Sequence, residues 1–188
     1  MPRVTLLTPS DVLDFWFSQD RKAWFEKNPA FDEQIRGRFL ALVEQALRDE
    51  LNLWRSEPPG CLALVILLDQ FPRNIFRGSA RAFAGDQLAR DAARIILDKG
   101  WDKSMTPDER MFVYLPFEHS ESLADQERCL ALMKEISAFP ETADLPKWAE
   151  AHLAIIRRFG RFPHRNAALG RESTPEEITF LKEPGSRF

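Results

Sequence analysis

Cysteine, histidine and tyrosine are scarce in this chain, and so is net charge. These scarcities argue against several classes of protein. The chain has only two cysteines, three histidines and one tyrosine, and its formal net charge is −3. Two cysteines cannot build a disulfide-rich scaffold, and a weakly acidic chain has no overall attraction for nucleic acids or membrane surfaces. We expect Cys61 and Cys129 to be reduced thiols in the core of a cytoplasmic protein; a bridge between them is the alternative.

Long apolar runs are also missing. The longest, Cys61–Leu68, is far shorter than the roughly 20 residues that a membrane-spanning helix needs. The N-terminal residues Met1–Leu7 lack the apolar segment and cleavage site of a signal peptide. With 188 residues, 44% hydrophobic and 29% charged, the chain has the size and composition of one soluble globular domain over residues 1–188.

Apolar residues recur at helical spacing, and strand signals are absent. Phe31, Ile35 and Phe39 mark one face of a helix that begins at Asn28-Pro29. We predict an all-α fold of antiparallel helix pairs, forming a tetratricopeptide-like right-handed helical array without a sheet. Pro72 is expected to end the most apolar helix near Phe71, and Pro116 to kink or end another. Helix-start signals, with side chains that can cap the first turn, occur at Thr8, Asp20, Asn28, Thr106, Asp144 and Thr174.

Familiar catalytic motifs are missing as well. The chain has no H-E-x-x-H, no paired E-x-x-H and no G-x-S-x-G, so we predict no metal site and no cofactor. The adjacent His119 and Ser120 do not form a nucleophile pair, because neighbouring residues on one element do not face each other.

Three polar segments depart from the amphipathic pattern: residues 67–78, residues 114–122 and residues 152–172. The third holds five arginines, two of the three histidines and no acidic residue between Glu150 and Glu172. In the first, Asp69 follows a fully apolar run. A lone carboxylate near a core is costly, so we expect it to pair with Arg73 or a distant arginine.

The arginines allow three interpretations. They can be structural, with Arg157 and Arg158 complementing a helix C-terminus and the others forming ion pairs with Asp69, Asp86, Glu118 or Glu121. They can bind a phosphate or carboxylate ligand, because guanidinium groups match planar anions. RNA contact is a third, less favoured reading, since the basic pattern is short and the chain is acidic. A histidine oriented by a carboxylate could serve as a general base beside them.

Five motifs together resemble the bacterial domain of unknown function 924 family. They are L-L-D-Q-F-P-R-N at residues 67–74, A-F-A-x-D at 82–86, L-P-F-x-H-S-E at 115–121, R-F-G-R-F-P-H-R-N at 158–166 and G-R-x-S-T-x-E-E at 170–177. The resemblance covers nearly the whole chain and implies an all-helical, tetratricopeptide-like fold, but no activity. The family pattern is often apolar at the position of Glu118, which favours Glu121 as the functional acid.

We therefore expect a small-molecule binder, or an enzyme, acting on an anionic metabolite, phosphorylated ones included. The alternative is a tetratricopeptide-like interaction module, in which the polar motifs lock the fold or grip a peptide carboxylate. No membrane or nucleic-acid partner is expected. The predicted catalytic residues are His119, Glu121 and His164, and the predicted ligand-binding residues are Asp69, Arg73, Asn74, Arg158, Arg161, Arg165 and Asn166.

Overall fold

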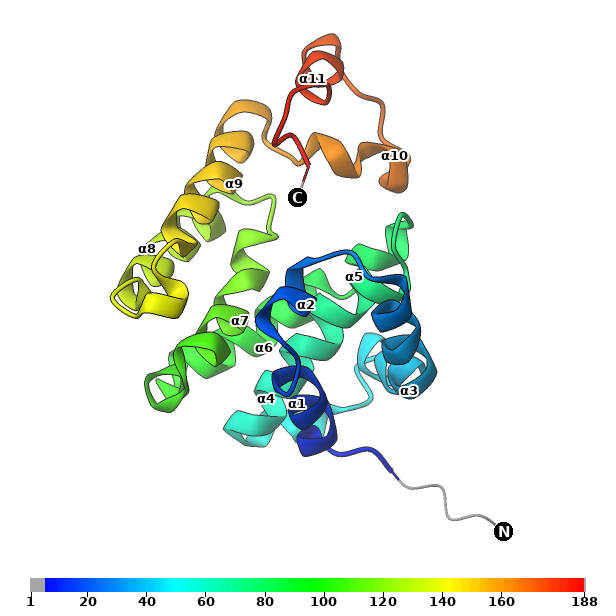
Figure 1. Ribbon diagram of the computed structural model, residues 1–188, viewed down its shortest axis with the longest axis vertical. Helices are drawn as coiled ribbons and strands as arrows, with labels where there is room; N and C mark the ends of the chain where they lie inside the picture. Colours follow the sequence, from blue (N-terminus) through cyan, green and yellow to red (C-terminus); the bar gives the residue numbers. More distant parts are fainter. Residues whose placement is uncertain (1–5, 188) are drawn as a thin grey trace. The chain divides into compact units, whose positions relative to one another are not determined.

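The computed structural model describes residues 6–187, and all regular elements in that range are helices (Figure 1). The prediction of an all-α fold is confirmed. The chain divides into two compact units, which are described separately. Unit 1 comprises the residues up to Arg77 together with Arg81–Pro116, and unit 2 comprises Gly78–Ala80 together with the residues from Phe117 onward. A single domain over residues 1–188 stays a prediction, and the N-terminal residues 1–5 lie outside the described range.

Unit 1 holds the first helices of the chain. In order they are α1 (Pro9–Phe17), α2 (Arg21–Phe25), α3 (Pro29–Leu47), the 3-10 helix η1 (Asn52–Ser56), α4 (Pro58–Val65), the π-helix η2 (Ile66–Gln70), α5 (Phe71–Ile75), the 3-10 helix η3 (Ala80–Phe83), α6 (Asp86–Asp98), the 3-10 helix η4 (Trp101–Ser104) and α7 (Pro107–Glu118), whose last residues belong to unit 2.

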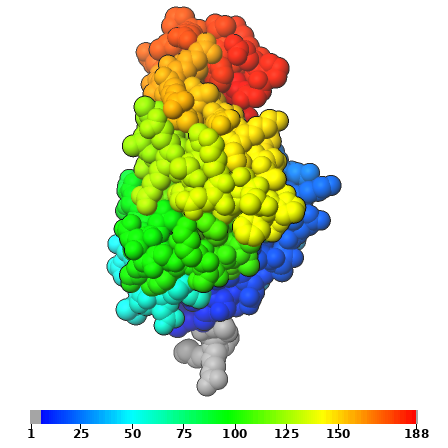
Figure 2. All heavy atoms as spheres, turned by 90° about the vertical axis from the view of Figure 1, so that its left-hand side faces the viewer, coloured from blue at the N-terminus to red at the C-terminus, as the bar shows by residue number. Residues whose placement is uncertain are grey.

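Unit 2 is built on a helix pair. Helices α8 (Leu123–Ile136) and α9 (Leu145–Phe159) pack against each other, and Figure 2 shows them side by side on the surface. The elements that follow are shorter. Besides the 3-10 helix η5 (Pro140–Thr142) between α8 and α9, they are the 3-10 helix η6 (Pro163–Arg165), α10 (Asn166–Leu169) and α11 (Pro175–Phe180).

Most predicted helix starts are confirmed. The side chains of Thr8, Asp20 and Asn28 accept hydrogen bonds from the first turns of α1, α2 and α3. Thr106 and Thr174 form reciprocal capping boxes with Glu109 and Glu177. These caps satisfy N–H groups that have no partner inside the helix. Asp144 also precedes a helix, but its side chain accepts from the indole of Trp148 instead of capping.

The core of unit 1 surrounds the apolar run predicted to be a buried helix. All residues from Cys61 to Gln70 are buried, and so are the predicted inward positions of α3. Aromatic rings pack edge to face or tilted beside this run, with Trp16 and Phe71 among those that are fully buried. Cys61 and Cys129 are buried free thiols, as expected, and burial raises the pKa of Cys61 to about 11.

The prediction that Pro72 ends the apolar helix is wrong, because the helix continues to Ile75. Pro72 has no N–H for the carbonyl four residues earlier, and the chain accommodates this with the wider π turn of η2. The N–H of Phe71 bonds to the carbonyl of Ile66, five residues back. Helix α7 likewise runs through Pro116 to Glu118. A proline near a helix end therefore does not have to end the helix.

A close backbone contact joins η2 to the start of α6. Gly85 lies against the carbonyl group of Leu68, and a Cβ added there would be 2.9 Å from the carbonyl carbon and closer still to its oxygen. Only glycine fits without moving one of the two backbones. Gly85 precedes Asp86, so this contact also sets the position of the Asp86 carboxylate.

The C-terminal part of unit 2 closes over the end of α9. Phe180 of α11 packs with Ile155, Ile156 and Phe162 in one apolar cluster. Helix α9 ends at Gly160, whose φ of 70° is the left-handed conformation that glycine adopts easily. No helix within residues 6–187 has both the length and the apolar character needed to cross a membrane.

Candidate functional site

The first polar motif is neutralised inside unit 1. Arg73 donates to both carboxylate oxygens of Asp86, at 2.9 and 3.2 Å, and to the backbone carbonyl of Asp69. The Asp69 carboxylate is fully buried and lies 3.3 Å from the same guanidinium. Burial lowers the pKa of Arg73, but the charges of Asp69 and Asp86 outweigh it and the net pKa is raised. The predicted Asp69–Arg73 pair is present.

Asn74 belongs to a second node of unit 1. Its amide donates to Asp32 on α3 at 2.8 Å, and Arg77 donates to both oxygens of the same carboxylate. Arg73 and Asn74 therefore face different partners, although they are adjacent in sequence. The two nodes join α5 to α6 and to α3.

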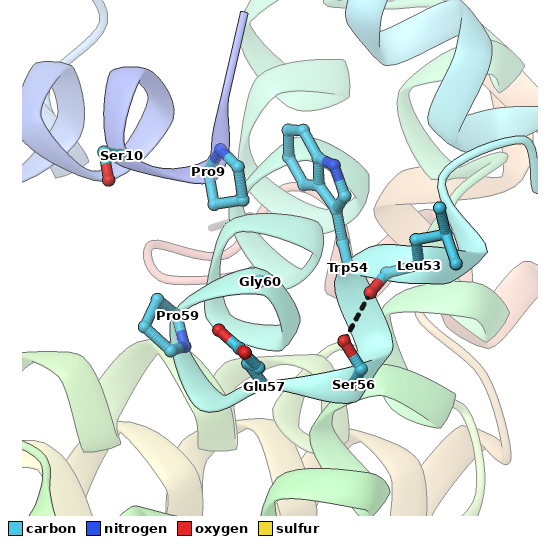
Figure 3. Close-up of a pocket in the computed structure, with 8 residues that line it drawn as sticks. All are labelled: Pro9, Ser10, Leu53, Trp54, Ser56, Glu57, Pro59 and Gly60. Atoms are coloured by element: carbon cyan, nitrogen blue, oxygen red, sulfur yellow. Dashed lines mark hydrogen bonds between the residues drawn. The ribbon is translucent and has the colours of Figure 1, made fainter.

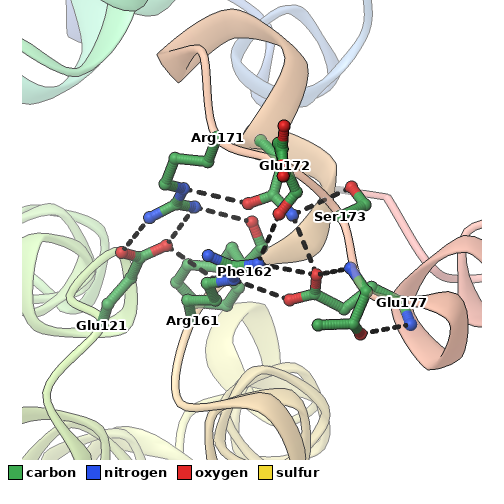
Figure 4. A network of polar contacts seen from close by, with 9 residues as sticks. Glu121, Arg161, Phe162, Arg171, Glu172, Ser173 and Glu177 are labelled. Carbon is green, nitrogen blue, oxygen red and sulfur yellow. Dashed lines mark hydrogen bonds and ion pairs between the residues drawn. The ribbon is translucent and has the colours of Figure 1, made fainter.

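In unit 2, Glu177 is the acceptor at the centre of a polar network (Figure 4). Arg161 donates to its two oxygens at 2.7 and 2.8 Å, and the Asn166 amide and the Thr174 backbone N–H also donate to it. These hydrogen bonds, those from Arg161 above all, lower the pKa of Glu177 to about 2. A carboxylate that is 2% exposed is thereby kept charged.

A second node of this network joins the histidine-bearing motif to the arginine-bearing loop. Arg171 donates to both oxygens of Glu121, at 2.7 and 2.9 Å, and Glu121 also accepts from the backbone N–H of Phe162 (Figure 4). Burial raises the pKa of Glu121, but the hydrogen bonds from Arg171 and Phe162 outweigh it, and the net pKa is lowered. Arg171 reaches the carbonyl of Phe162 and the side chain of Asn166 as well.

The ring of Phe162 gathers the basic residues around it. The imidazoles of His152 and His164 lie 5.7 and 5.6 Å from it, between ring centroids, and the guanidinium of Arg165 stacks 4.6 Å from its centre. Arg165 is only 6% exposed. Since the nodes of Glu177 and Glu121 fix the backbone of the loop, Phe162 is held in place. Of its three neighbours, His152 comes from α9, and His164 and Arg165 come from η6.

His152 is neutral at ordinary pH. Burial, with a smaller effect from His119, His164 and Arg165, lowers its pKa to about 3, although a hydrogen bond to Trp148 opposes this. That bond joins Nδ1 to a carbonyl oxygen at 2.9 Å, so Nδ1 carries the proton. The buried carboxylate of Glu118 lies 3.6 Å from the same nitrogen.

His152, His164 and Arg165 around Phe162, together with His119, are named the basic cluster. His119 directly follows α7, the other members come from α9 and η6, and all four belong to unit 2. The charge of His119, like those of His164 and Arg165, contributes to the lowered pKa of His152. Among residues 6–187, no group of three or more histidine, cysteine or acidic side chains has the arrangement of a metal site.

The comparisons with known proteins agree with the motifs. The sequence model of a bacterial family of proteins of unknown function (DUF924) matches residues 12–185. The chain belongs to this family. A solved structure of a protein of unknown function from Agrobacterium tumefaciens is similar, with 42% sequence identity, a TM-score of 0.85, and coverage of 93% of this chain and 96% of that one. No curated protein matches the chain.

The predicted site residues of this DUF924 protein fall in both units. Asp69, Arg73 and Asn74 lie in unit 1, in the two nodes described above. In unit 2, the Asn166 side chain donates to Glu177, the partner of Arg161, and accepts a hydrogen bond from Arg171. The remaining predicted residues of unit 2 are His119, Glu121, Arg158, His164 and Arg165.

In the structural interpretation, the four expected acids were wrong for Arg161, which pairs with Glu177 of α11. Arg171 does pair with one of them, Glu121. Arg158, expected to complement a helix C-terminus, pairs with Glu176 of α11. The sequence signal that could have indicated this is the second capping box, which places Glu177 at a helix start. Arg171, His152 and Phe162 were also not among the predicted site residues.

The stability of this DUF924 protein should fall continuously as the pH drops from 6.5 to about 3. The folded-state pKa of His152, about 3, is below the ordinary 6.5, so the unfolded chain binds its proton first. The same holds for Glu177 between pH 4.5 and about 2. Each such proton contributes up to about 1.4 kcal/mol per pH unit. Urea unfolding measured across this range tests the prediction.

His152→Gln is the matched variant for the upper part of that range. It removes the titrating imidazole and keeps an N–H donor for the Trp148 carbonyl. The slope between pH 6.5 and 4.5 should become shallower, while the slope below pH 4.5 persists. An unchanged slope above pH 4.5 would show that His152 is not the group responsible.

Proposed function

We propose that this protein binds a small anionic metabolite at the basic cluster, with Arg165, His164 and His119 as the binding groups. The observation that carries the proposal is the gathering of His164 and Arg165 at Phe162, on a loop held by two ion-paired nodes. His119 is near enough to contribute to the lowered pKa of His152. A buried guanidinium is costly to desolvate. It is suited to a site where an anion replaces the lost water, because its fork matches carboxylate and phosphate oxygens.

The proposal gives the other arginines of the loop a supporting role. Arg158, Arg161 and Arg171 are each engaged by a glutamate of unit 2. They hold the loop on which His164 and Arg165 lie, and preorganised groups bind at a lower cost in conformational entropy. Glu121 acts by fixing the backbone of Phe162.

Within the proposal, His119 and His164 are the groups that can exchange a proton with a bound ligand. Imidazole is the side chain best suited to proton transfer near neutral pH. His152 is not, because its low pKa keeps it neutral. Catalysis would therefore depend on His119 or His164, as the sequence predicts, and ligand binding on Arg165.

A thermal-shift screen of phosphorylated and carboxylated metabolites tests the proposal. A ligand present at 100 times its Kd should stabilise the protein by about 2.7 kcal/mol. For any compound that stabilises the protein, Arg165→Gln should weaken binding at least tenfold. Arg157→Gln is the matched control, since Arg157 is exposed, lies on α9 and pairs with Glu127 at the surface. Binding that survives Arg165→Gln, or no stabiliser in a broad library, contradicts the proposal.

A second candidate is a helical interaction module in which the polar motifs serve only the fold. The pairing of Arg73, Arg158, Arg161 and Arg171 with carboxylates favours it. If Arg161→Ala destabilises the protein strongly and no anion binds the wild type, this candidate replaces the first. A peptide ending in a free carboxylate, compared with its amidated form, would then be the ligand to test.

A further inference from the structure

We infer that unit 1 contains a binding site for an organic cation, a guanidinium or alkylammonium group, in a hollow between η1, the start of α4 and the start of α1. The hollow has a volume of about 280 Å³, enough for one such group and its solvent shell. Its walls combine one carboxylate, one indole and three small or ring-shaped apolar residues, as Figure 3 shows. Among the residues that line the hollow are Pro9, Trp54, Glu57, Pro59 and Gly60.

Glu57 supplies the negative charge of the hollow. It is the residue before α4, but its side chain does not cap the helix. Within residues 6–187 the only bond involving this residue is the one from Cys61 N–H to its backbone carbonyl, so the carboxylate has neither a hydrogen bond nor an ion pair. Among the described residues this carboxylate has no counter-charge, and it is exposed to an external cation.

The helix start beside Glu57 is poorly suited to an anion. Helix N-termini bind anions through their first backbone N–H groups. In α4 the first two positions are Pro58 and Pro59, which have no N–H. Two of the donors that an anion would use are thus missing next to Glu57. The Glu57 carboxylate therefore sets the charge of the hollow, and a matching ligand is a cation.

Trp54 provides the second element of cation recognition. Its indole borders the hollow together with Pro9 and the Glu57 carboxylate (Figure 3). An aromatic face and a carboxylate together favour guanidinium and ammonium groups over neutral groups of the same shape. The position of η1 is fixed, because Gly60 lies against the Trp54 carbonyl so closely that a Cβ would not fit. The site is therefore formed before the ligand arrives.

Methylguanidinium and its neutral isostere methylurea test the inference on the full-length protein. The indole N–H signal of Trp54, assigned by its loss in Trp54→Phe, is followed by NMR at constant ionic strength. We expect saturable shifts with methylguanidinium, a Kd in the millimolar range, and at least fivefold weaker binding in Glu57→Gln. A capped tripeptide with a central arginine is titrated in parallel, and the tighter of the two probes shows whether a free cation or a side chain is the better ligand.

Glu26→Gln is the charge-matched control, since Glu26 is an exposed glutamate of unit 1 outside the hollow. It should bind methylguanidinium like the wild type. The inference is overturned if methylurea shifts the signal equally, if Glu57→Gln binds as well as the wild type, if Glu26→Gln weakens binding as much, or if neither cationic probe binds. Glu57→Gln should fold normally, because the Glu57 carboxylate makes no hydrogen bond with any residue in the range 6–187.

Discussion

Glu177→Ala is expected to lower the free energy of unfolding by about 3 kcal/mol. The carboxylate is 2% exposed and accepts from Arg161, Asn166 and the backbone of Thr174. Removing it leaves a largely enclosed guanidinium without its counter-charge and opens the capping box of α11. The partial exposure of Arg161, 28%, keeps the loss at the lower end of the range for buried pairs.

The neighbouring residue provides a matched control for this prediction. Glu176 is on the same helix and pairs with Arg158 of α9, but both side chains of that pair are exposed. Exposed pairs contribute about 0.2–1 kcal/mol, so Glu176→Ala should have a small effect. Urea unfolding followed by circular dichroism at pH 7 measures both. Equal losses in the two variants would mean that burial of the Glu177 node does not determine its strength.

Gly85→Ala is expected to destabilise the protein by about 3 kcal/mol or to prevent folding. The added methyl group would meet the carbonyl of Leu68, part of a backbone and not a flexible side chain. To relieve the contact, α6 must move away from η2. Since Asp86 follows directly, the movement would also disturb its two hydrogen bonds with Arg73. Thermal and urea unfolding measure the loss.

Gly37→Ala is the control, and it should raise the free energy of unfolding where Gly85→Ala lowers it. Gly37 is an exposed residue inside α3, and a Cβ there would meet no atom within 4 Å. Alanine is the better helix former by up to about 1 kcal/mol, so this variant should be slightly more stable than the wild type. If Gly85→Ala were also neutral or stabilising, the close contact between Gly85 and Leu68 could not be a constraint on the fold.

Local patterns were enough to predict most of the helices. Thr8, Asn28 and Thr174 start helices because their side chains bond to N–H groups within the next three residues, which is an interaction of neighbours in sequence. The buried face of α3 followed from its periodicity for the same reason. Pro72 was misjudged because its local effect, the loss of one N–H, is compensated by a π turn inside a core that the sequence does not display.

The partners of the arginines were the least predictable feature. Arg73 was correctly matched with Asp69, four residues away on one helix. Arg161 was not matched with Glu177, because many carboxylates are equally plausible until the chain folds back. Phe162 was not among the predicted site residues, although its ring is the surface on which His152, His164 and Arg165 meet.

The sequence by itself therefore determined the helical class, most of the helix starts and the family of this protein, since these depend on short-range spacing and on motifs. The tertiary structure alone decided which carboxylate neutralises which arginine, and which basic residues remain grouped at Phe162. The physical reason is separation along the sequence. A helix cap forms within one turn, whereas the polar contacts that hold the loop of Arg165 join residues 41–50 positions apart, as Glu121 does with Phe162 and with Arg171.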